Sequence, residues 1–162
     1  MSLISPPTPT LPYYLEGYGF PKSENALLPW SYVSERMSTP QNYWVCTITP
    51  SGKPHARPIW GVWVDDRLYF GGGPDTRWFR NLKVNPKVTV HLEDGSETVI
   101  LEGKAILMDD NALAKDGLMT KIDDAYEAKY GMRHGPPIWQ LQPDFVFAWQ
   151  SMETVTRFVF NA

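Results

Sequence analysis

Short runs of β-branched and aromatic residues, each closed by turn residues, constrain the fold of this chain more than any other feature. Tyr43–Thr49 is followed by Pro-Ser-Gly-Lys, Pro54–Val64 by Asp-Asp, and Arg67–Gly71 by a glycine-rich loop. This order of strands and tight turns is typical of a β-meander. Further strands are predicted over residues 87–93, 97–108, 145–150 and 154–160.

Helices are predicted between these strands, where apolar residues recur every three or four positions. They cover about 29–40, 76–84 and the segment from Asp109 or Asp110 to Lys129, and residues 131–143 are predicted to be a loop. About six strands with inserted helices, and no regular βαβ alternation, predict a mainly β fold: a small, partly open β-barrel.

The length of 162 residues predicts a single folded domain, which we place at residues 25–162. Residues 1–24 are rich in proline, which rules out a regular helix. The segment is either a disordered tail or an extended arm, and we favour the arm because it carries several large apolar side chains. These are Leu11, Tyr13, Tyr14 and Phe20.

Charge and composition narrow the class of protein. The net charge of -3 argues against a nucleic-acid partner, which usually selects a basic face. The single cysteine, Cys46, rules out an internal disulfide and is predicted to be a small buried apolar residue. The chain shows no signal-peptide pattern and no apolar run long enough for a membrane span, so we expect a cytoplasmic protein without a membrane partner.

The loop after the third strand predicts a phosphate site. Gly71, Gly72 and Gly73 allow close approach to the backbone, and a helix begins at Thr76 and Arg77. The free N–H groups of a helix start, its dipole and a guanidinium together favour a phosphate. The spacing matches neither a Walker A loop nor a dinucleotide fingerprint. The alternative is an ordinary N-cap followed by a solvent-exposed arginine.

Other chemistry-bearing residues give weaker signals. Arg57 lies on a predicted strand, where it is either a surface charge or a second phosphate ligand. His55, His91 and His134 lack metal-ligand spacing, so no metal site is predicted. The paired carboxylates at 109–110 and 123–124 are interpreted as solvated helix positions. No side chain stands out as a general acid or base.

An ordered set of motifs resembles the pyridoxamine 5'-phosphate oxidase-like split-barrel superfamily. The resemblance covers roughly residues 28–160. It is carried by Y-W-V-C-T at 43–47, S-G-K-P-H at 51–55, P-I-W-G-V-W at 58–63, L-Y-F at 68–70, T-R at 76–77, R-N-L at 80–82, N-P-K-V at 85–88, P-D-F-V-F-A-W at 143–149 and T-R-F at 156–158. The resemblance implies a six-stranded Greek-key split β-barrel, usually a homodimer with FMN at the subunit interface.

The resemblance also assigns cofactor-binding residues. The second strand along the flavin corresponds to Arg57, Pro58, Ile59 and Trp60, and the end of the third strand to Phe70 and Gly71, with Gly72 following in the loop. The phosphate triplet corresponds to Thr76, Arg77 and Trp78, where relatives with FMN often have lysine in place of the tryptophan. Trp149 and Arg157 resemble the residues that reach the cofactor from the partner subunit.

The function implied is an FMN-dependent oxidoreductase that transfers hydride through the bound cofactor to a small-molecule substrate. One alternative is an F420-dependent reductase on the same fold, with Lys53, Arg57 or Arg80 holding the longer phosphate tail. Another is a flavin- or haem-binding module without turnover, for which His55 is the candidate axial ligand. A structural dimer with an empty site is the remaining alternative.

Overall fold

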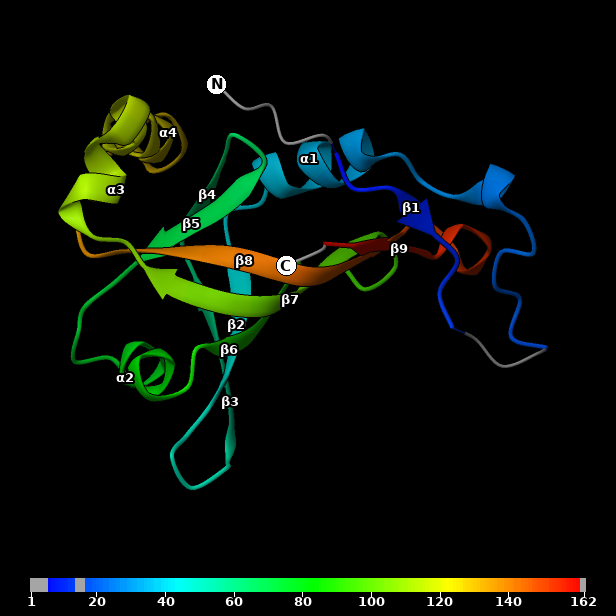
Figure 1. Cartoon of the computed structure of the whole chain (residues 1–162), viewed down its shortest axis with the longest axis horizontal. Helices are drawn as coiled ribbons and strands as arrows, with labels where there is room; N and C mark the ends of the chain where they lie inside the picture. Colours follow the sequence, from blue (N-terminus) through cyan, green and yellow to red (C-terminus); the bar gives the residue numbers. More distant parts are fainter. Residues whose placement is uncertain (1–5, 14–16, 161–162) are drawn as a thin grey trace.

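The structure is a computed structural model that describes residues 6–13 and 17–160 (Figure 1). The helices of the described part are α1 (Trp30–Ser38), α2 (Arg77–Val84), α3 (Asp110–Ala114) and α4 (Leu118–Tyr130), with short 3-10 turns at Glu24–Ala26, Lys115–Gly117 and Met152–Thr154. The strands are β1 (Pro9–Thr10), β2 (Tyr43–Ile48), β3 (Pro54–Ile59), β4 (Gly61–Val64), β5 (Arg67–Gly71), β6 (Lys87–His91), β7 (Thr98–Leu107), β8 (Ile138–Trp149) and β9 (Thr156–Val159).

The strands form one antiparallel sheet in the order β1-β9-β8-β7-β6-β2-β3. Strand β5 leaves this path, because it pairs with β4 on one side and with β8 on the other. The sheet remains open at β3, whose ladder within the described chain is with β2 alone. The prediction of a mainly β fold with a few inserted helices is confirmed, and the open sheet is consistent with a split barrel.

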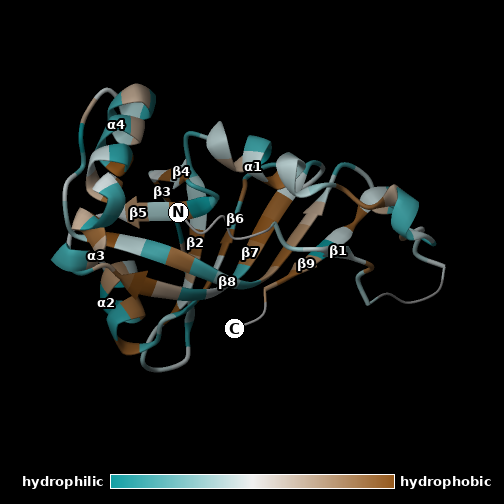
Figure 2. Ribbon diagram, turned by 45° about the horizontal axis from the view of Figure 1, so that its top comes forward, coloured by the Kyte–Doolittle hydropathy of each residue, from teal (hydrophilic) through white to brown (hydrophobic). Residues whose placement is uncertain are grey.

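Alternating side chains place one face of each strand in the core. In β2 the inward residues Tyr43, Val45 and Thr47 are buried, and the residues between them are partly or fully exposed. Figure 2 shows the apolar colour concentrated along the strands, with hydrophilic colour on the exposed sides of the helices. The main core therefore lies between the curved sheet and helices α1 and α2, which contribute Val33, Met37, Phe79 and Leu82.

A smaller core cluster holds α4 against β4 and β5. Ile122 and Tyr126 are fully buried one helical turn apart, and they pack with Val62, Tyr69 and Ile138. This cluster fixes the C-terminal turn of α4 close to the junction between β3 and β4. None of the helices in the described part of the chain is long and apolar enough to cross a membrane.

The structure corrects three predicted boundaries. The loop predicted over 131–143 is wrong from Ile138 onward, where β8 begins. The sheet tolerates Pro143 because it lies next to a bulge in β8: Pro143 faces Gly103 and Phe145 faces Glu102, which leaves Asp144 without a partner in β7. A Cβ at Gly103 would lie 2.1 Å from the Gln142 carbonyl oxygen, so glycine permits this close approach.

The other two corrections divide predicted elements. The strand predicted over 54–64 is interrupted at Trp60, which separates β3 from β4. The helix predicted from 109 to 129 is divided into α3 and α4, because Asp116 and Gly117 have left-handed backbone angles (φ 52° and 66°). Cys46, predicted to be buried, is only half-buried on the outward side of β2.

The N-terminal segment pairs with the domain over a short stretch. Pro9 and Thr10 lie opposite Phe158 and Arg157 in an antiparallel pair of strands. Tyr13 is 90% exposed and does not pack on the domain, whereas Tyr14 lies outside the described residues. The placement of a separate arm at residues 1–24 stays a prediction.

Candidate functional site

The turn from β5 into α2 presents a helix start whose N–H groups no side chain caps. Thr76 is the N-cap residue, with extended backbone angles (φ -69°, ψ 148°). Its hydroxyl donates backward to the Gly73 carbonyl at 2.8 Å, and its backbone N–H donates to the same oxygen at 3.0 Å. The first N–H groups of α2 therefore remain available, together with the positive end of the helix dipole.

The glycines of this turn serve the packing of this chain's own aromatic rings. A Cβ at Gly71 would lie 2.3 Å from Cε1 of His134, and a Cβ at Gly72 would lie 2.5 Å from Cζ2 of Trp78. Gly73 has open space around it, with its nearest neighbour at 3.8 Å. None of these three glycines has a positive φ, so close packing, and not a left-handed conformation, requires glycine at 71 and 72.

Two arginines from separate elements lie near His55. Burial, followed by the charges of Arg57 and Arg77, lowers the pKa of His55. Neither arginine forms an ion pair with a carboxylate of the described chain. Arg57 donates only to the adjacent Ala56 carbonyl, at 2.8 Å. His55 also has a buried Nδ1 atom without a hydrogen-bond partner in the described chain. The cluster is thus an uncompensated positive site.

Buried hydrogen bonds hold this cluster together. Asn81 of α2 donates to the Thr47 hydroxyl on β2 at 2.9 Å, and that hydroxyl donates at 3.5 Å to the His55 carbonyl on β3. Asn81 and Thr47 are both buried, so the contacts are shielded from water. This link fixes the position of α2 relative to the strand that carries Arg57.

Two of the predicted cofactor residues have side chains inside the core. Phe70 and Trp78 are both buried, and their ring centroids lie 5.8 Å apart. Their side chains therefore face the interior, and only their backbone groups border the α2 turn. Trp78 occupies the position where the phosphate triplet of relatives often carries a lysine, so the cations of this site come from Arg57 and Arg77.

The end of β3 exposes a ring and an unpaired backbone edge. Trp60 is 46% exposed and stacks on Tyr130 at 4.4 Å, with a 7° angle between the ring planes. Ile59 is half-buried, and Pro58 is exposed. Because β3 pairs with β2 alone, the backbone groups of residues 57–59 that face away from β2 have no ladder partner in the described chain, whereas the Trp60 carbonyl accepts from the Tyr126 hydroxyl at 3.3 Å.

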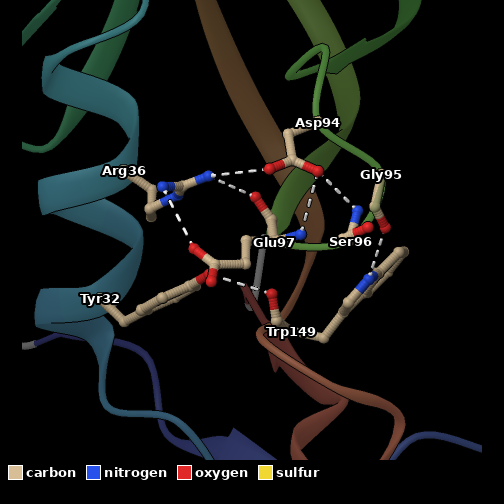
Figure 3. A network of polar contacts seen from close by, with 7 residues as sticks. All are labelled: Tyr32, Arg36, Asp94, Gly95, Ser96, Glu97 and Trp149. Atoms are coloured by element: carbon tan, nitrogen blue, oxygen red, sulfur yellow. Dashed lines mark hydrogen bonds and ion pairs between the residues drawn. The ribbon is translucent and has the colours of Figure 1, made fainter.

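Trp149 lies far from the α2 turn within this chain. Figure 3 shows its indole Nε1 donating to the Gly95 carbonyl at 2.9 Å, while its own carbonyl accepts from the Tyr32 hydroxyl at 2.9 Å. In the same network Arg36 pairs with Asp94 and Glu97 and anchors the turn between β6 and β7 to α1. Trp149 therefore has an evident role in holding α1 and this turn together.

Arg157 lies on β9, at the opposite end of the sheet from α2 (Figure 1). Its Nε donates to the Thr10 hydroxyl at 3.3 Å. The chain thus brings together Arg57, Thr76 and Arg77, whereas it does not bring Trp149 or Arg157 to them. The role assigned to these two residues from a partner subunit stays a prediction.

Sequence reasoning missed the residues of α4 and of the loop that follows it. His134 covers Gly71 and packs against Tyr126, with ring centroids 4.9 Å apart. Asp123, interpreted as a solvated carboxylate, instead accepts from the backbone N–H groups of His134 and Gly135 at 3.2 and 3.0 Å. The spacing of Tyr126 and Tyr130 indicates that they share one face of a helix, but this spacing does not indicate which strand that face contacts.

The comparisons with known proteins are decisive for the family. The sequence model described as pyridoxamine 5'-phosphate oxidase matches residues 33–158, which span most of the described domain. The chain belongs to the pyridoxamine 5'-phosphate oxidase family. No curated protein matches it. Membership in this family agrees with the open, mostly antiparallel sheet.

Solved structures share the fold at low sequence identity. A haem-binding protein from Mycobacterium smegmatis is 18% identical, with a TM-score of 0.65 over 82% of this chain and 59% of that protein. A conserved hypothetical protein from Mycobacterium tuberculosis is 16% identical, with a TM-score of 0.62 over 78% and 88%. A structure titled F420 reductase is 20% identical, with a TM-score of 0.52 over 74% and 98%. These likenesses concern the fold.

Proposed function

We propose that this family member is an FMN-binding oxidoreductase whose phosphate site is the start of α2. One observation carries the proposal: Arg57 and Arg77 both lie close enough to His55 to lower its pKa, no carboxylate of the described chain pairs with either arginine, and Arg77 stands at the uncapped start of α2. A phosphate monoester supplies the missing negative charge and accepts from the free N–H groups. The Nδ1 atom of His55 fits the same interpretation, since it is a buried polar atom without a hydrogen-bond partner in the described chain.

The residues of this chain would bind, orient and shield the cofactor. Arg57 and Arg77 would neutralise its phosphate, and the hydroxyl of Thr76 would turn from the Gly73 carbonyl to donate to the same group. The open edge of residues 57–59 would hydrogen-bond the polar edge of the ring system, and the exposed Trp60 would cover part of it. Hydride transfer is the chemistry that FMN supplies when bound. The substrate would be a small molecule that reaches the ring from solvent.

We propose further that the active form is a cytoplasmic homodimer with the cofactor at the interface. The outward side of β2 supports this, because Trp44 and Cys46 are only partly buried and Ile48 is 40% exposed. Covering this side with a second copy would bury apolar surface. It would also allow Trp149 and Arg157 to approach the α2 turn of the other subunit.

Titration of the apo protein with FMN and riboflavin tests the phosphate site. Riboflavin has the same ring system and no phosphate, so the wild type is expected to bind FMN more tightly than riboflavin. Arg77→Met is expected to weaken FMN binding by about ten- to hundredfold, the value of charge-assisted hydrogen bonds, and to leave riboflavin binding unchanged. Arg133→Met, which removes an arginine paired to acids on α4, is the matched control. Equal binding of FMN and riboflavin by the wild type would overturn the proposal.

The deazaflavin F420 is the second candidate cofactor, because the elements that carry the two arginines also carry additional cations. Lys53 on the β2–β3 turn and Arg80 on the exposed side of α2 are both exposed. Parallel titration with F420 decides the matter: tighter binding of F420 than of FMN, lost on Lys53→Met and Arg80→Met, would favour this cofactor. A Soret band in the purified protein that disappears with His55→Ala would instead indicate a haem-binding module.

A further inference from the structure

A groove separate from the α2 turn lies between α1, β4 and α4. It has a volume of about 350 Å³ and is lined by Ser38, Val62, Trp63, Ala125, Ala128 and Lys129. Figures 1 and 2 both place α1, β4 and α4 on one side of the molecule and α2 on the other. The groove is therefore distinct from the site that we assign to the cofactor phosphate.

The sequence of α4 explains why this space is hollow. Ile122 and Tyr126 carry the large buried side chains of the helix into the core cluster. Ala125 and Ala128 lie beside them on the side that faces β4, and their methyl groups do not fill the space opposite Val62 and Trp63. The walls of the groove therefore combine the apolar side chains of Val62, Trp63, Ala125 and Ala128 with the polar groups of Ser38 and Lys129, a mixture that also occurs in sites for small organic ligands.

Lys129 brings a positive charge into this groove that no carboxylate of the described chain neutralises. Its Nζ donates to the Tyr43 hydroxyl at 2.7 Å and to the Gly61 carbonyl at 3.2 Å, which are both neutral groups. The nearby acids are paired elsewhere, because Arg133 contacts Asp123, Asp124 and Glu127. Burial lowers the pKa of Lys129 to about 8, so the ammonium form prevails at neutral pH.

Trp63 contributes a second donor without an acceptor. Its indole Nε1 is buried and has no hydrogen-bond partner in the described chain. The ring packs at an angle against Trp30 of α1, with centroids 6.3 Å apart, so its orientation is fixed by the core. Because the ring also lines the groove, its indole N–H signal reports on whatever occupies the groove.

We propose that this groove binds a small monocarboxylate, with Lys129 holding the carboxylate and the apolar body of the ligand lying against Val62, Trp63 and Ala128. A phosphate dianion suits the groove less well, since no arginine lines the groove to offer it a guanidinium. Lys129 also lies in the last turn of α4, where the helix dipole is negative and offsets part of its charge.

Benzoate is a probe of the required size and chemistry, and benzamide is its neutral counterpart. The indole N–H signals of the wild-type protein are followed by NMR, with the Trp63 signal identified from Trp63→Phe. Benzoate is expected to move the Trp63 signal in a saturable manner, and benzamide to move it little at equal concentration. Absence of saturation, or an equal effect of benzamide, would overturn the proposal whatever the behaviour of any variant.

Lys129→Met keeps the aliphatic stem and removes the charge. We expect it to weaken benzoate binding by about tenfold or more, as the loss of one charge-assisted contact predicts. Lys115→Met, at an exposed lysine in the turn between α3 and α4, is the control and is expected to change the affinity less than about twofold. Unchanged affinity in Lys129→Met would contradict the proposal. FMN affinity measured on the same variant separates this site from the cofactor site, which should not be affected.

Discussion

Gly72 lies directly against the indole of Trp78, so closely that a Cβ at residue 72 would be 2.5 Å from Cζ2. Trp78 is buried between Phe70 and Phe79, so its ring has no room to move aside. The backbone of the β5–α2 turn therefore packs directly against the buried side chain of Trp78. The geometry of the candidate phosphate site depends on this packing.

Gly72→Ala is expected to destabilise the protein by about 1–3 kcal/mol, because overpacking forces shifts in a well-packed core. Urea unfolding measures the change in free energy. Gly73→Ala is the matched control, since its Cβ would meet nothing closer than 3.8 Å, and its effect should stay within about 0.5 kcal/mol. An equal cost at both positions would show that the contact with Trp78 is not what requires glycine at residue 72.

The proximity of the two arginines to His55 predicts a measurable change in its pKa. Burial and the charges of Arg57 and Arg77 lower this pKa, so Arg77→Met is expected to raise it. In the wild type, binding of a phosphate near Arg57 and Arg77 should also raise the pKa of His55. Titration of the His55 ring by NMR tests both statements, with Arg133→Met as control. A downward shift in Arg77→Met would contradict the arrangement.

Asn81 and Thr47 are expected to be energetically coupled. Asn81→Ala leaves the Thr47 hydroxyl without its buried donor, and the loss should be about 1–3 kcal/mol of unfolding free energy. Thr47→Val should cost a similar amount, and the double variant less than the sum of the two. Additive effects in this double-mutant cycle would indicate that the two side chains act independently.

Lys129 is expected to make the stability depend on pH. Its pKa of about 8 in the folded chain lies below the ordinary 10.5, so the unfolded chain binds more protons between these values. The cost of holding the ammonium in the folded state is therefore full below pH 8 and falls as pH rises towards 10.5. Because the Lys129 ammonium is only partly buried, solvent screening lowers this free-energy cost to about 1 kcal/mol. Lys129→Met should be more stable than the wild type by that amount at pH 7, and the difference should shrink at pH 10.

Local patterns in the sequence were sufficient for much of the fold. The β-branched and aromatic residues of Tyr43–Thr49 and the turn that follows them predicted β2, and Arg67–Gly71 coincides with β5. The start of α2 at Thr76 and its end before Pro86 were also predicted, because a cap and a proline act within a few residues. These are signals that a short window of sequence contains.

Such local signals do not predict contacts between residues that are far apart in the sequence. Residues 131–143 were predicted to be a loop, and only the bulge opposite Gly103 shows how β8 accommodates Pro143. Asp123 was interpreted as solvated, but it binds the backbone of the loop that carries His134. The groove beside Lys129 had no sequence pattern, since it forms where three elements meet.

By itself, the sequence determined the strands, the helix start with its arginine, and the family to which the motifs belong, because each depends on neighbours along the chain. The tertiary structure alone decided that Gly71 and Gly72 face His134 and Trp78, that the charges of Arg57 and Arg77 both act on His55, and that no carboxylate of the described residues pairs with Lys129. The physical reason is that packing and charge compensation depend on which elements approach one another in space, and spacing along the chain does not encode that approach.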